Sequence, residues 1–145
     1  MLKGISNLIS PRMLMVLSEM GHGDRIVLAD GNFPAESVGR NSLVIRADGH
    51  GIPQLLEAIL PLFPLDTAVA CPVNVMAVSP GDNVEPHIWE EYQRIIREND
   101  PRAADAIGQI ERFAFYEQAR SAYAIIATGE SALYGNIMLQ KGVIT

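Results

Sequence analysis

Hydrophobic residues recur along this chain with two alternating spacings, which predict helices and strands in turn. Between Ser10 and Gly21 the apolar residues are three to four positions apart, as on one face of a helix. Ser10 suits the N-cap of that helix and Pro11 its first position. The next apolar run, residues 26–29, is unbroken, which is typical of a strand buried on both faces of a sheet. The chain is therefore expected to begin with a helix and then a strand.

Prolines and glycines mark the limits of the later elements. Pro53 opens a second helix that Pro61 ends or kinks, and Pro86 opens a third that ends near Asn99. Pro80-Gly81-Asp82 predicts a turn before that third helix. Further strands are predicted, in chain order, over residues 43–45, 68–78 (interrupted at Pro72), 110–115, 123–127 and 136–139, with a loop over 31–41 and a short helix over 116–122.

This alternation favours a layered α/β domain with a mixed, partly parallel sheet. A chain of 145 residues is close to the usual size of one domain. It shows no internal repeat and no linker long enough to divide it, so we expect a single domain over residues 1–145.

Composition narrows the choice of partners. Hydrophobic residues make up 48% of the chain and charged residues 19%, so part of the apolar surface is expected between subunits of a homo-oligomer. The net charge of −6, with scattered Lys and Arg, offers no basic face for nucleic acid. Cys71 is the only cysteine, which excludes an internal disulfide and a cysteine-rich metal site. Neither a signal peptide nor a membrane-spanning run is recognisable, so a cytoplasmic protein is expected.

The tripeptide Gly21-His22-Gly23 carries the first candidate chemistry. Two glycines leave the imidazole unshielded, and the next strand ends in Asp30. A histidine and a carboxylate that converge on one crevice can act together as acid and base, and an imidazole, with an ordinary pKa near 6.5, exchanges protons near neutrality. The alternative is a helix cap at Gly21, a turn at Gly23 and a solvated loop histidine.

A second candidate is the segment Arg112-Phe113-Ala114-Phe115-Tyr116-Glu117, which gathers a cation, three aromatic residues and a carboxylate within six positions. Aromatic faces pack against the apolar side of a pyranose ring, and Arg donates hydrogen bonds to hydroxyls in a fixed fork. The alternative is a strand with core phenylalanines and an exposed ion pair.

Two further segments have both a functional and a structural interpretation. In Tyr134-Gly135-Asn136 the glycine lets two hydrogen-bonding side chains enter one pocket, although the segment also reads as a β-turn between the last two strands. Arg46 and Asp48 share one face of a strand by alternation, and they can simply pair with each other.

Taken together, these segments resemble the L-fucose mutarotase and D-ribose pyranase family, and the Arg112 segment resembles its fucose branch. The likeness runs nearly end to end and is weakest over residues 68–108. The segments that carry it are Ile9-Ser10-Pro11, Met20-Gly21-His22-Gly23-Asp24, Asp30 with Phe33-Pro34, Arg46-Ala47-Asp48-Gly49, Arg112 to Glu117, Thr128-Gly129-Glu130, Tyr134-Gly135-Asn136-Ile137 and Lys141-Gly142-Val143.

The resemblance implies a three-layer α/β/α fold, a homo-oligomer in the form of a decameric ring with sites near subunit boundaries, and a free monosaccharide as the substrate. The implied reaction interconverts α and β anomers, with L-fucose favoured, by acid–base ring opening and reclosure that needs no cofactor or metal. By the same resemblance His22 is the proton donor and Asp30 a substrate ligand and candidate base. Arg112, Tyr134, Gly135 and Asn136 complete the expected sugar site.

Three alternatives remain open. D-ribose pyranase activity needs the same proton transfers in a different pocket. A non-catalytic monosaccharide-binding protein would use the same aromatic and Arg residues without turnover. A metal hydrolase would use His22, Asp24 and Asp30 as ligands, whereas in the mutarotase interpretation Asp24 could orient the imidazole from behind.

Overall fold

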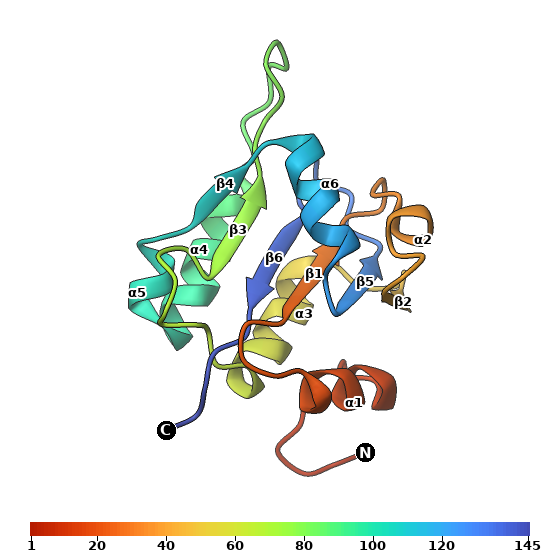
Figure 1. Cartoon of the computed structure of the whole chain (residues 1–145), viewed down its shortest axis with the longest axis vertical. Coiled ribbons are helices and arrows are strands. Elements are labelled where there is room, and N and C mark those ends of the chain that lie inside the picture. The colour runs from red at the N-terminus through yellow and green to blue at the C-terminus, as the bar shows by residue number, and fades with distance from the viewer.

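A single six-stranded sheet, with strand order β2-β5-β1-β6-β3-β4, forms the centre of the molecule. The computed structural model describes all of residues 1–145, and Figure 1 shows the sheet running across it. The strands are β1 (Arg25–Ala29), β2 (Leu43–Ala47), β3 (Val73–Met76), β4 (Gly108–Ile110), β5 (Ala124–Thr128) and β6 (Ile137–Gln140).

Strand direction decides which residues can meet. β1 pairs in parallel with β5, β5 in parallel with β2, and β3 in parallel with β4. β6 is antiparallel to both of its neighbours, β1 and β3. The sheet is therefore mixed and mostly parallel, as predicted. The carboxyl ends of five strands lie along the same edge as the beginning of β6, and we call this the carboxyl edge of the sheet.

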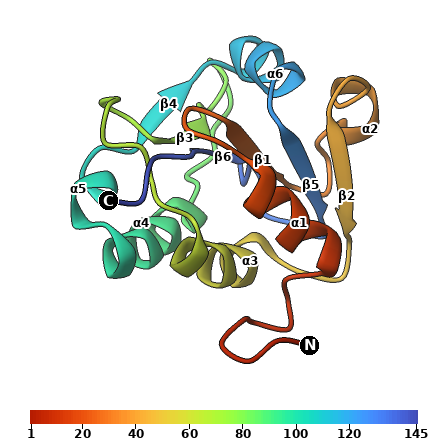
Figure 2. The same ribbon diagram turned by 60° about the horizontal axis from the view of Figure 1, so that its bottom comes forward.

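Helices cover both faces of the sheet, which confirms the three-layer arrangement. The helices are α1 (Pro11–Glu19), α2 (Ala35–Val38), α3 (Ile52–Ile59), the 3₁₀ turn η1 (Leu60–Leu62), α4 (Ile88–Asn99), α5 (Pro101–Ala104) and α6 (Arg112–Arg120). α1, α3, α4 and α5 pack on one face, and α2 and α6 pack on the other (Figure 2). None of these helices is long and apolar enough to cross a membrane.

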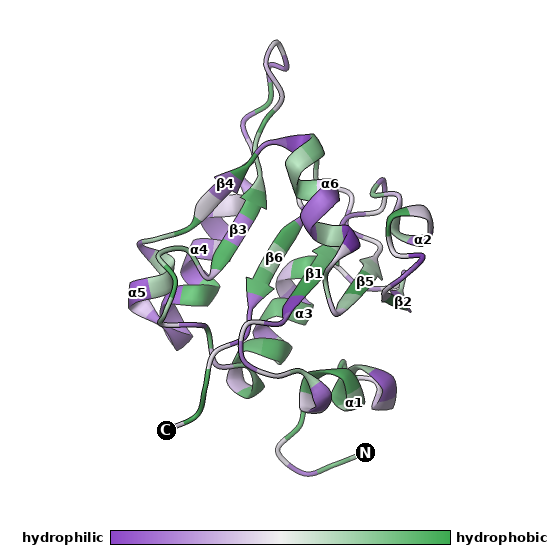
Figure 3. Ribbon diagram, viewed as in Figure 1, coloured by the Kyte–Doolittle hydropathy of each residue, from purple (hydrophilic) through white to green (hydrophobic).

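Alternation along the strands divides the core in two. In β1, Ile26 and Leu28 face the layer that contains α3 and α4, whereas Val27 and Ala29 face α6. All four of these residues are fully buried, which explains why the run reads as continuously apolar. The apolar colouring of the central strands in Figure 3 follows this burial on both faces.

Several predicted element limits are confirmed. The Ser10 hydroxyl accepts a hydrogen bond from the Met13 N–H at 3.1 Å, so it is the N-cap of α1. The regular part of the second helix ends at Ile59, and Pro61 lies within the 3₁₀ turn η1 that follows it. The Asp82 N–H donates to the Ser79 carbonyl at 3.1 Å, which closes the predicted turn. That turn belongs to residues 77–87, which join β3 to α4 and project well beyond the sheet (Figure 1).

Three predictions need correction. The predicted loop over residues 31–41 contains the short helix α2, and the predicted strand over 68–78 is extended only at Val73–Met76. The predicted strand over 110–115 is wrong, because β4 ends at Ile110 and a helix begins at Arg112. Glu111 is the cause: its carboxylate accepts the N–H groups of Phe113 and Ala114 and so caps α6.

Candidate active site

A cavity of about 240 Å³ opens at the carboxyl edge of the sheet. It lies where β1 ends and β6 begins, between α6 and the projecting 77–87 segment. Its lining residues are Asp30, Asn32, Phe33, Met76, Asp82, Val84, Arg112, Tyr116, Leu133, Tyr134 and Asn136. The structure thus brings together Asp30, Arg112, Tyr134 and Asn136, four of the six residues predicted from the sequence.

Asp30 is the buried acid of this cavity. Its Oδ1 accepts the Asn32 N–H at 3.0 Å, and its own N–H donates to Asn136 Oδ1 at 2.8 Å. Burial raises the pKa of the Asp30 carboxyl, the N–H groups around it oppose this rise, and the negative charge of Glu130 adds to it. A carboxyl whose pKa is raised exchanges protons closer to neutrality, which suits an acid–base role.

The turn at residues 134–136 forms the floor of the cavity and is held from below by α4. Trp89 Nε1 donates to the Tyr134 carbonyl at 2.9 Å, and the buried Tyr92 hydroxyl donates to the Gly135 carbonyl at 2.6 Å. A Cβ on Gly135 would lie only 3.1 Å from the Ala132 carbonyl oxygen, so the turn is packed around a glycine. Gly135 therefore shapes the floor and does not itself line the cavity.

Arg112 and Tyr116 reach the cavity from the first turn of α6. Because they are four residues apart on a helix, they stack: Arg112 Nε donates to the Tyr116 hydroxyl at 3.2 Å, and the guanidinium lies 5.6 Å from the ring centroid. Arg112 makes no ion pair with a carboxylate of this chain. Its terminal N–H groups remain available to a ligand that offers oxygen acceptors.

Of the three aromatic residues in this segment, only Tyr116 lines the cavity. Phe115 is fully buried against the sheet, whereas Phe113 is 66% exposed. Tyr116 was not among the predicted site residues, and the predicted boundary between a strand over 110–115 and a helix over 116–122 separated it from Arg112. The helical spacing Arg112-x-x-x-Tyr116, together with a capping acid at Glu111, was the signal that would have found it.

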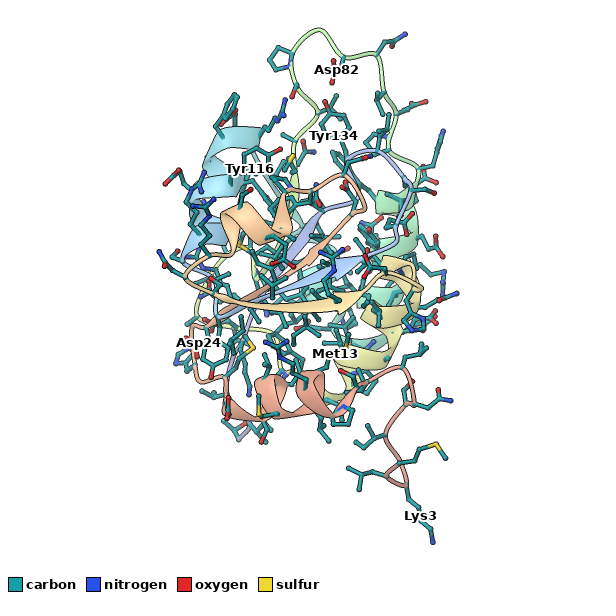
Figure 4. The ribbon with its side chains drawn as sticks, turned by 90° about the vertical axis from the view of Figure 1, so that its right-hand side faces the viewer. Lys3, Met13, Asp24, Asp82, Tyr116 and Tyr134 are labelled. Atoms are coloured by element: carbon teal, nitrogen blue, oxygen red, sulfur yellow. The ribbon has the colours of Figure 1, made fainter.

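His22 lies at the opposite end of β1 from Asp30. The five residues of β1 separate the two and span roughly 16 Å at about 3.3 Å per residue. The prediction that these two side chains converge is therefore wrong within one chain. Figure 4 shows the separation, with Tyr116, Tyr134 and Asp82 gathered at one end and Asp24, close to His22 in sequence, near α1. The metal triad of His22, Asp24 and Asp30 fails for the same reason.

The partner of His22 is Asp66, a residue that the sequence did not reveal. His22 Nε2 lies 3.1 Å from Asp66 Oδ1, and the histidine side chain is 53% exposed while the aspartate side chain is 4% exposed. Asp66 also accepts hydrogen bonds from the Ala68 N–H and from Gln140 Nε2, both at 2.9 Å. These hydrogen bonds hold the pKa of Asp66 below its ordinary value, and the bond from the Ala68 N–H contributes most. The carboxylate is therefore ionised and can only accept.

The prediction that Asp24 could orient the imidazole of His22 is wrong. Its Oδ2 accepts the Gly21 N–H at 2.7 Å and so closes the turn around His22. Lys141 secures the same turn, since its Nζ donates to the carbonyls of Leu17 and Met20 at 2.7 and 2.6 Å. The only sequence signal for Asp66 is one charged residue in an apolar stretch, which does not specify a contact 44 positions away.

Arg46 and Asp48 belong to neither cluster. They pair with each other at the exposed edge of β2, with Arg46 Nη2 2.5 Å from Asp48 Oδ1, which confirms the structural interpretation of that segment. The structure thus contains two candidate clusters: the cavity around Asp30, and the exposed His22 backed by Asp66.

The model of the RbsD / FucU transport protein family matches residues 3–144 of this sequence. The chain belongs to that family. Human fucose mutarotase is 52% identical over 147 residues, an alignment that covers 99% of this chain and 94% of the human protein.

Solved structures agree with this family assignment. The crystal structure of FucU from Bifidobacterium longum is 59% identical, with a TM-score of 0.96, and covers 99% of this chain and 100% of that one. The Streptococcus pneumoniae fucose mutarotase, solved in complex with L-fucose, is 46% identical, with a TM-score of 0.91 and the same coverage. Bacillus subtilis RbsD, complexed with D-ribose, is only 21% identical with a TM-score of 0.74 over both full chains, so it shares the fold. Identity is therefore much higher to the fucose branch.

Proposed function

We propose that this protein is an L-fucose mutarotase that acts on the free sugar in the cytoplasm. The observation that carries the proposal is the Asp30 cavity, where a buried carboxyl with a raised pKa, a free guanidinium and a tyrosine converge in a chain 52% identical to human fucose mutarotase. A neutral sugar fits this chemistry, because Asp30 accepts hydroxyl protons and Arg112 donates to sugar oxygens. The single free cysteine, Cys71, suits a reducing compartment.

The reaction needs two proton transfers on opposite sides of one carbon–oxygen bond. A base takes the proton of the anomeric hydroxyl while an acid protonates the ring oxygen. The bond between the anomeric carbon and the ring oxygen then breaks and leaves the open-chain aldehyde. Rotation about the adjacent carbon–carbon bond and closure on the other face of the carbonyl give the second anomer and return both protons. We assign Asp30 to the anomeric hydroxyl and Arg112 to orientation of the ring substituents.

His22 is the proposed proton donor, and it reaches the cavity from a neighbouring subunit. Within one chain it is separated from Asp30 by the length of β1, yet its imidazole is half exposed and held in place from behind. Since Asp66 occupies Nε2, the nitrogen left to face a substrate is Nδ1. A protonated imidazole can donate from Nδ1 to a substrate while its Nε2–H donates to the Asp66 carboxylate.

The surface supports assembly into a ring of subunits, which we take to be a decamer. Large apolar side chains are exposed at the termini, at Met1, Leu2 and Ile144, and at the rim of the cavity, at Phe113 and Leu133. These exposed apolar side chains are available for contacts between subunits. Contacts at the rim would place a neighbour's loop beside Asp30 and would complete the site.

Anomer exchange by NMR tests the proposed function. Saturation transfer between the two anomeric proton signals of L-fucose should be faster with the purified protein than in buffer, and unchanged after treatment with a chelator. D-ribose measured in parallel should exchange more slowly than L-fucose. If the protein binds L-fucose but the exchange rate equals that in buffer, the protein is a monosaccharide-binding protein and not an enzyme. A larger acceleration of exchange for D-ribose than for L-fucose would favour the D-ribose pyranase activity instead.

A further inference from the structure

The hydroxyl of Tyr134 sits between the two ends of one β-turn. It accepts a hydrogen bond from the Ser79 N–H at 3.1 Å and donates to Oδ2 of Asp82. Ser79 and Asp82 are the first and last residues of the turn Ser79-Pro80-Gly81-Asp82, which the Asp82 N–H closes onto the Ser79 carbonyl. Figure 4 shows Tyr134 beneath Asp82 at the base of the projecting 77–87 segment.

The turn is preset to receive this hydroxyl. Pro80 fixes its own φ near the value that the second turn position requires, and Gly81 follows with a φ of +91°, as in a type II turn. The Ser79 N–H and the backbone that carries the Asp82 carboxylate are therefore held in place before the tyrosine binds them. The segment is joined to β4 at its start, where the Ala77 N–H donates to the Ile110 carbonyl at 2.8 Å, and residues 81–83 near its tip are all exposed.

Tyr134 is held in a strained backbone conformation on the other side of the contact. Its φ of +58° is the only positive value among the non-glycine residues. The left-handed conformation is sterically unfavourable for an L-residue with a Cβ, so it persists only where neighbouring contacts enforce it. Here Trp89 and Tyr92 hold the carbonyls of residues 134 and 135, and the side chain is thereby directed at the turn.

The hydroxyl of Tyr134 is consequently almost fully used. A phenol has one hydrogen to donate and two lone pairs; the hydrogen is given to Asp82, and one lone pair is taken by Ser79. Only one lone pair remains for a sugar. This is a different role from the expected one, in which Tyr134 binds and orients sugar hydroxyls.

We propose that Asp82 is a positioning residue that acts through Tyr134 and fastens the 77–87 segment as a fixed wall of the sugar cavity. Asp82, Val84 and Tyr134 all line the cavity, so the contact decides where one side of it stands. With the contact intact the wall is in place before the sugar arrives. Without it, the segment occupies the binding arrangement only part of the time, and the apparent affinity falls by that fraction.

The proposal rests on the mutarotase function and predicts a specific kinetic pattern. Asp82→Ala and Tyr134→Phe should each raise the KM for L-fucose about tenfold and leave kcat within about twofold of the wild-type value. A tenfold rise is expected if the 77–87 segment of the variant, without sugar, occupies the binding arrangement about a tenth of the time. Asp82→Asn should retain most of the wild-type KM, because its amide oxygen still accepts the phenol hydrogen. Glu85→Gln, which removes a charge from the same exposed segment, is the matched control and should behave as wild type.

A double variant separates positioning from direct sugar binding. If Asp82 acts through Tyr134, the pair Asp82→Ala and Tyr134→Phe should match either single variant, at about tenfold. Effects that multiply to about a hundredfold would show that each residue binds the sugar by itself, and would overturn the proposal. An unchanged KM in Asp82→Ala would overturn it as well.

Hydrogen exchange provides a readout that does not depend on activity. In the free protein, the peptide covering residues 77–87 should exchange its amide hydrogens faster in Asp82→Ala and Tyr134→Phe than in wild type, and at the wild-type rate in Glu85→Gln. Equal protection in the wild type and all three variants would show that the contact between Tyr134 and Asp82 does not hold the segment in place. An inactive wild type with the predicted exchange pattern would refute the mutarotase function and leave the positioning role of Asp82 standing.

Discussion

The carboxylate of Asp66 lies 3.1 Å from Nε2 of His22, and the two residues are 44 positions apart in the chain. One is nearly inaccessible to solvent and the other is half exposed. A buried acceptor therefore fixes the orientation of an accessible imidazole, as the proposed donation of a proton to a neighbouring subunit's cavity requires.

Replacing Asp66 by Asn should lower kcat by roughly tenfold, a part of the 10²- to 10⁴-fold that a positioned general acid contributes. KM should stay near its wild-type value, since Asp66 does not line the cavity. In a His22→Asn background, itself expected to lose about 10²-fold, the same change should have no further effect. Steady-state anomer exchange measures both. Asp105→Asn, at an exposed ion pair with Arg97, is the control. Additive losses would show that Asp66 acts elsewhere.

A second prediction concerns the shared site. His22→Asn and Asp30→Asn should each be inactive alone, but dissociating, mixing and reassembling equal amounts should restore about a quarter of the wild-type activity. In a random closed assembly one interface in four combines an intact His22 with an intact Asp30 from the neighbour. Exchange of subunits should be verified by native mass spectrometry. If subunits exchange and activity stays absent, a site that combines His22 of one subunit with Asp30 of its neighbour is refuted.

The raised pKa of Asp30 predicts a pH dependence of stability. A carboxyl with a folded pKa above its unfolded value binds more protons when folded, so its contribution to stability is complete below the ordinary pKa of 3.8 and declines as pH rises through the folded pKa. Asp30→Asn cannot ionise. The free energy of unfolding of the variant, relative to wild type, should therefore increase between pH 4 and pH 7. Urea denaturation at several pH values measures the difference. A difference that shrinks with rising pH would have the wrong sign.

Tyr92 offers a test of the cavity floor. Burial raises the pKa of its hydroxyl, so the hydroxyl remains a donor to the Gly135 carbonyl at every pH of interest. Tyr92→Phe leaves that carbonyl without its partner and should lower the free energy of unfolding by about 1–3 kcal/mol. The KM for L-fucose should also rise, because the turn under the sugar loosens. Tyr123→Phe, which removes an exposed hydroxyl bonded to Glu19, should change neither quantity measurably.

The sequence predicted much of the fold because local signals and burial agreed along most of the chain. The Ser10 cap, the unbroken apolar run of β1 and the two closing strands all follow from short-range patterns. The segment after Ile110 failed because its aromatic residues favour strands, while the decisive interaction is a cap formed by the side chain of Glu111. The capping geometry outweighed the composition.

The candidate site was predicted residue by residue more successfully than as an arrangement. Asp30, Arg112 and Asn136 do share one cavity, since strand ends and the start of α6 meet at one edge of the sheet. The separation of His22 from Asp30 follows from chain direction, because a residue before a strand and a residue after it must lie at opposite edges. Asp66 could not be found from sequence, as its contact with His22 depends on tertiary packing.

The last strand of the chain occupies the middle of the sheet. β6 pairs with β1 on one side and β3 on the other, so the two halves of the sheet have no strand pairing with each other until residues 137–140 are in place. During synthesis the facing edges of β1 and β3 therefore stay unpaired until nearly the whole chain has left the ribosome. A message truncated even ten codons early would yield a product without the joining strand. Such a product would expose unpaired strand edges and would be a target for proteolysis.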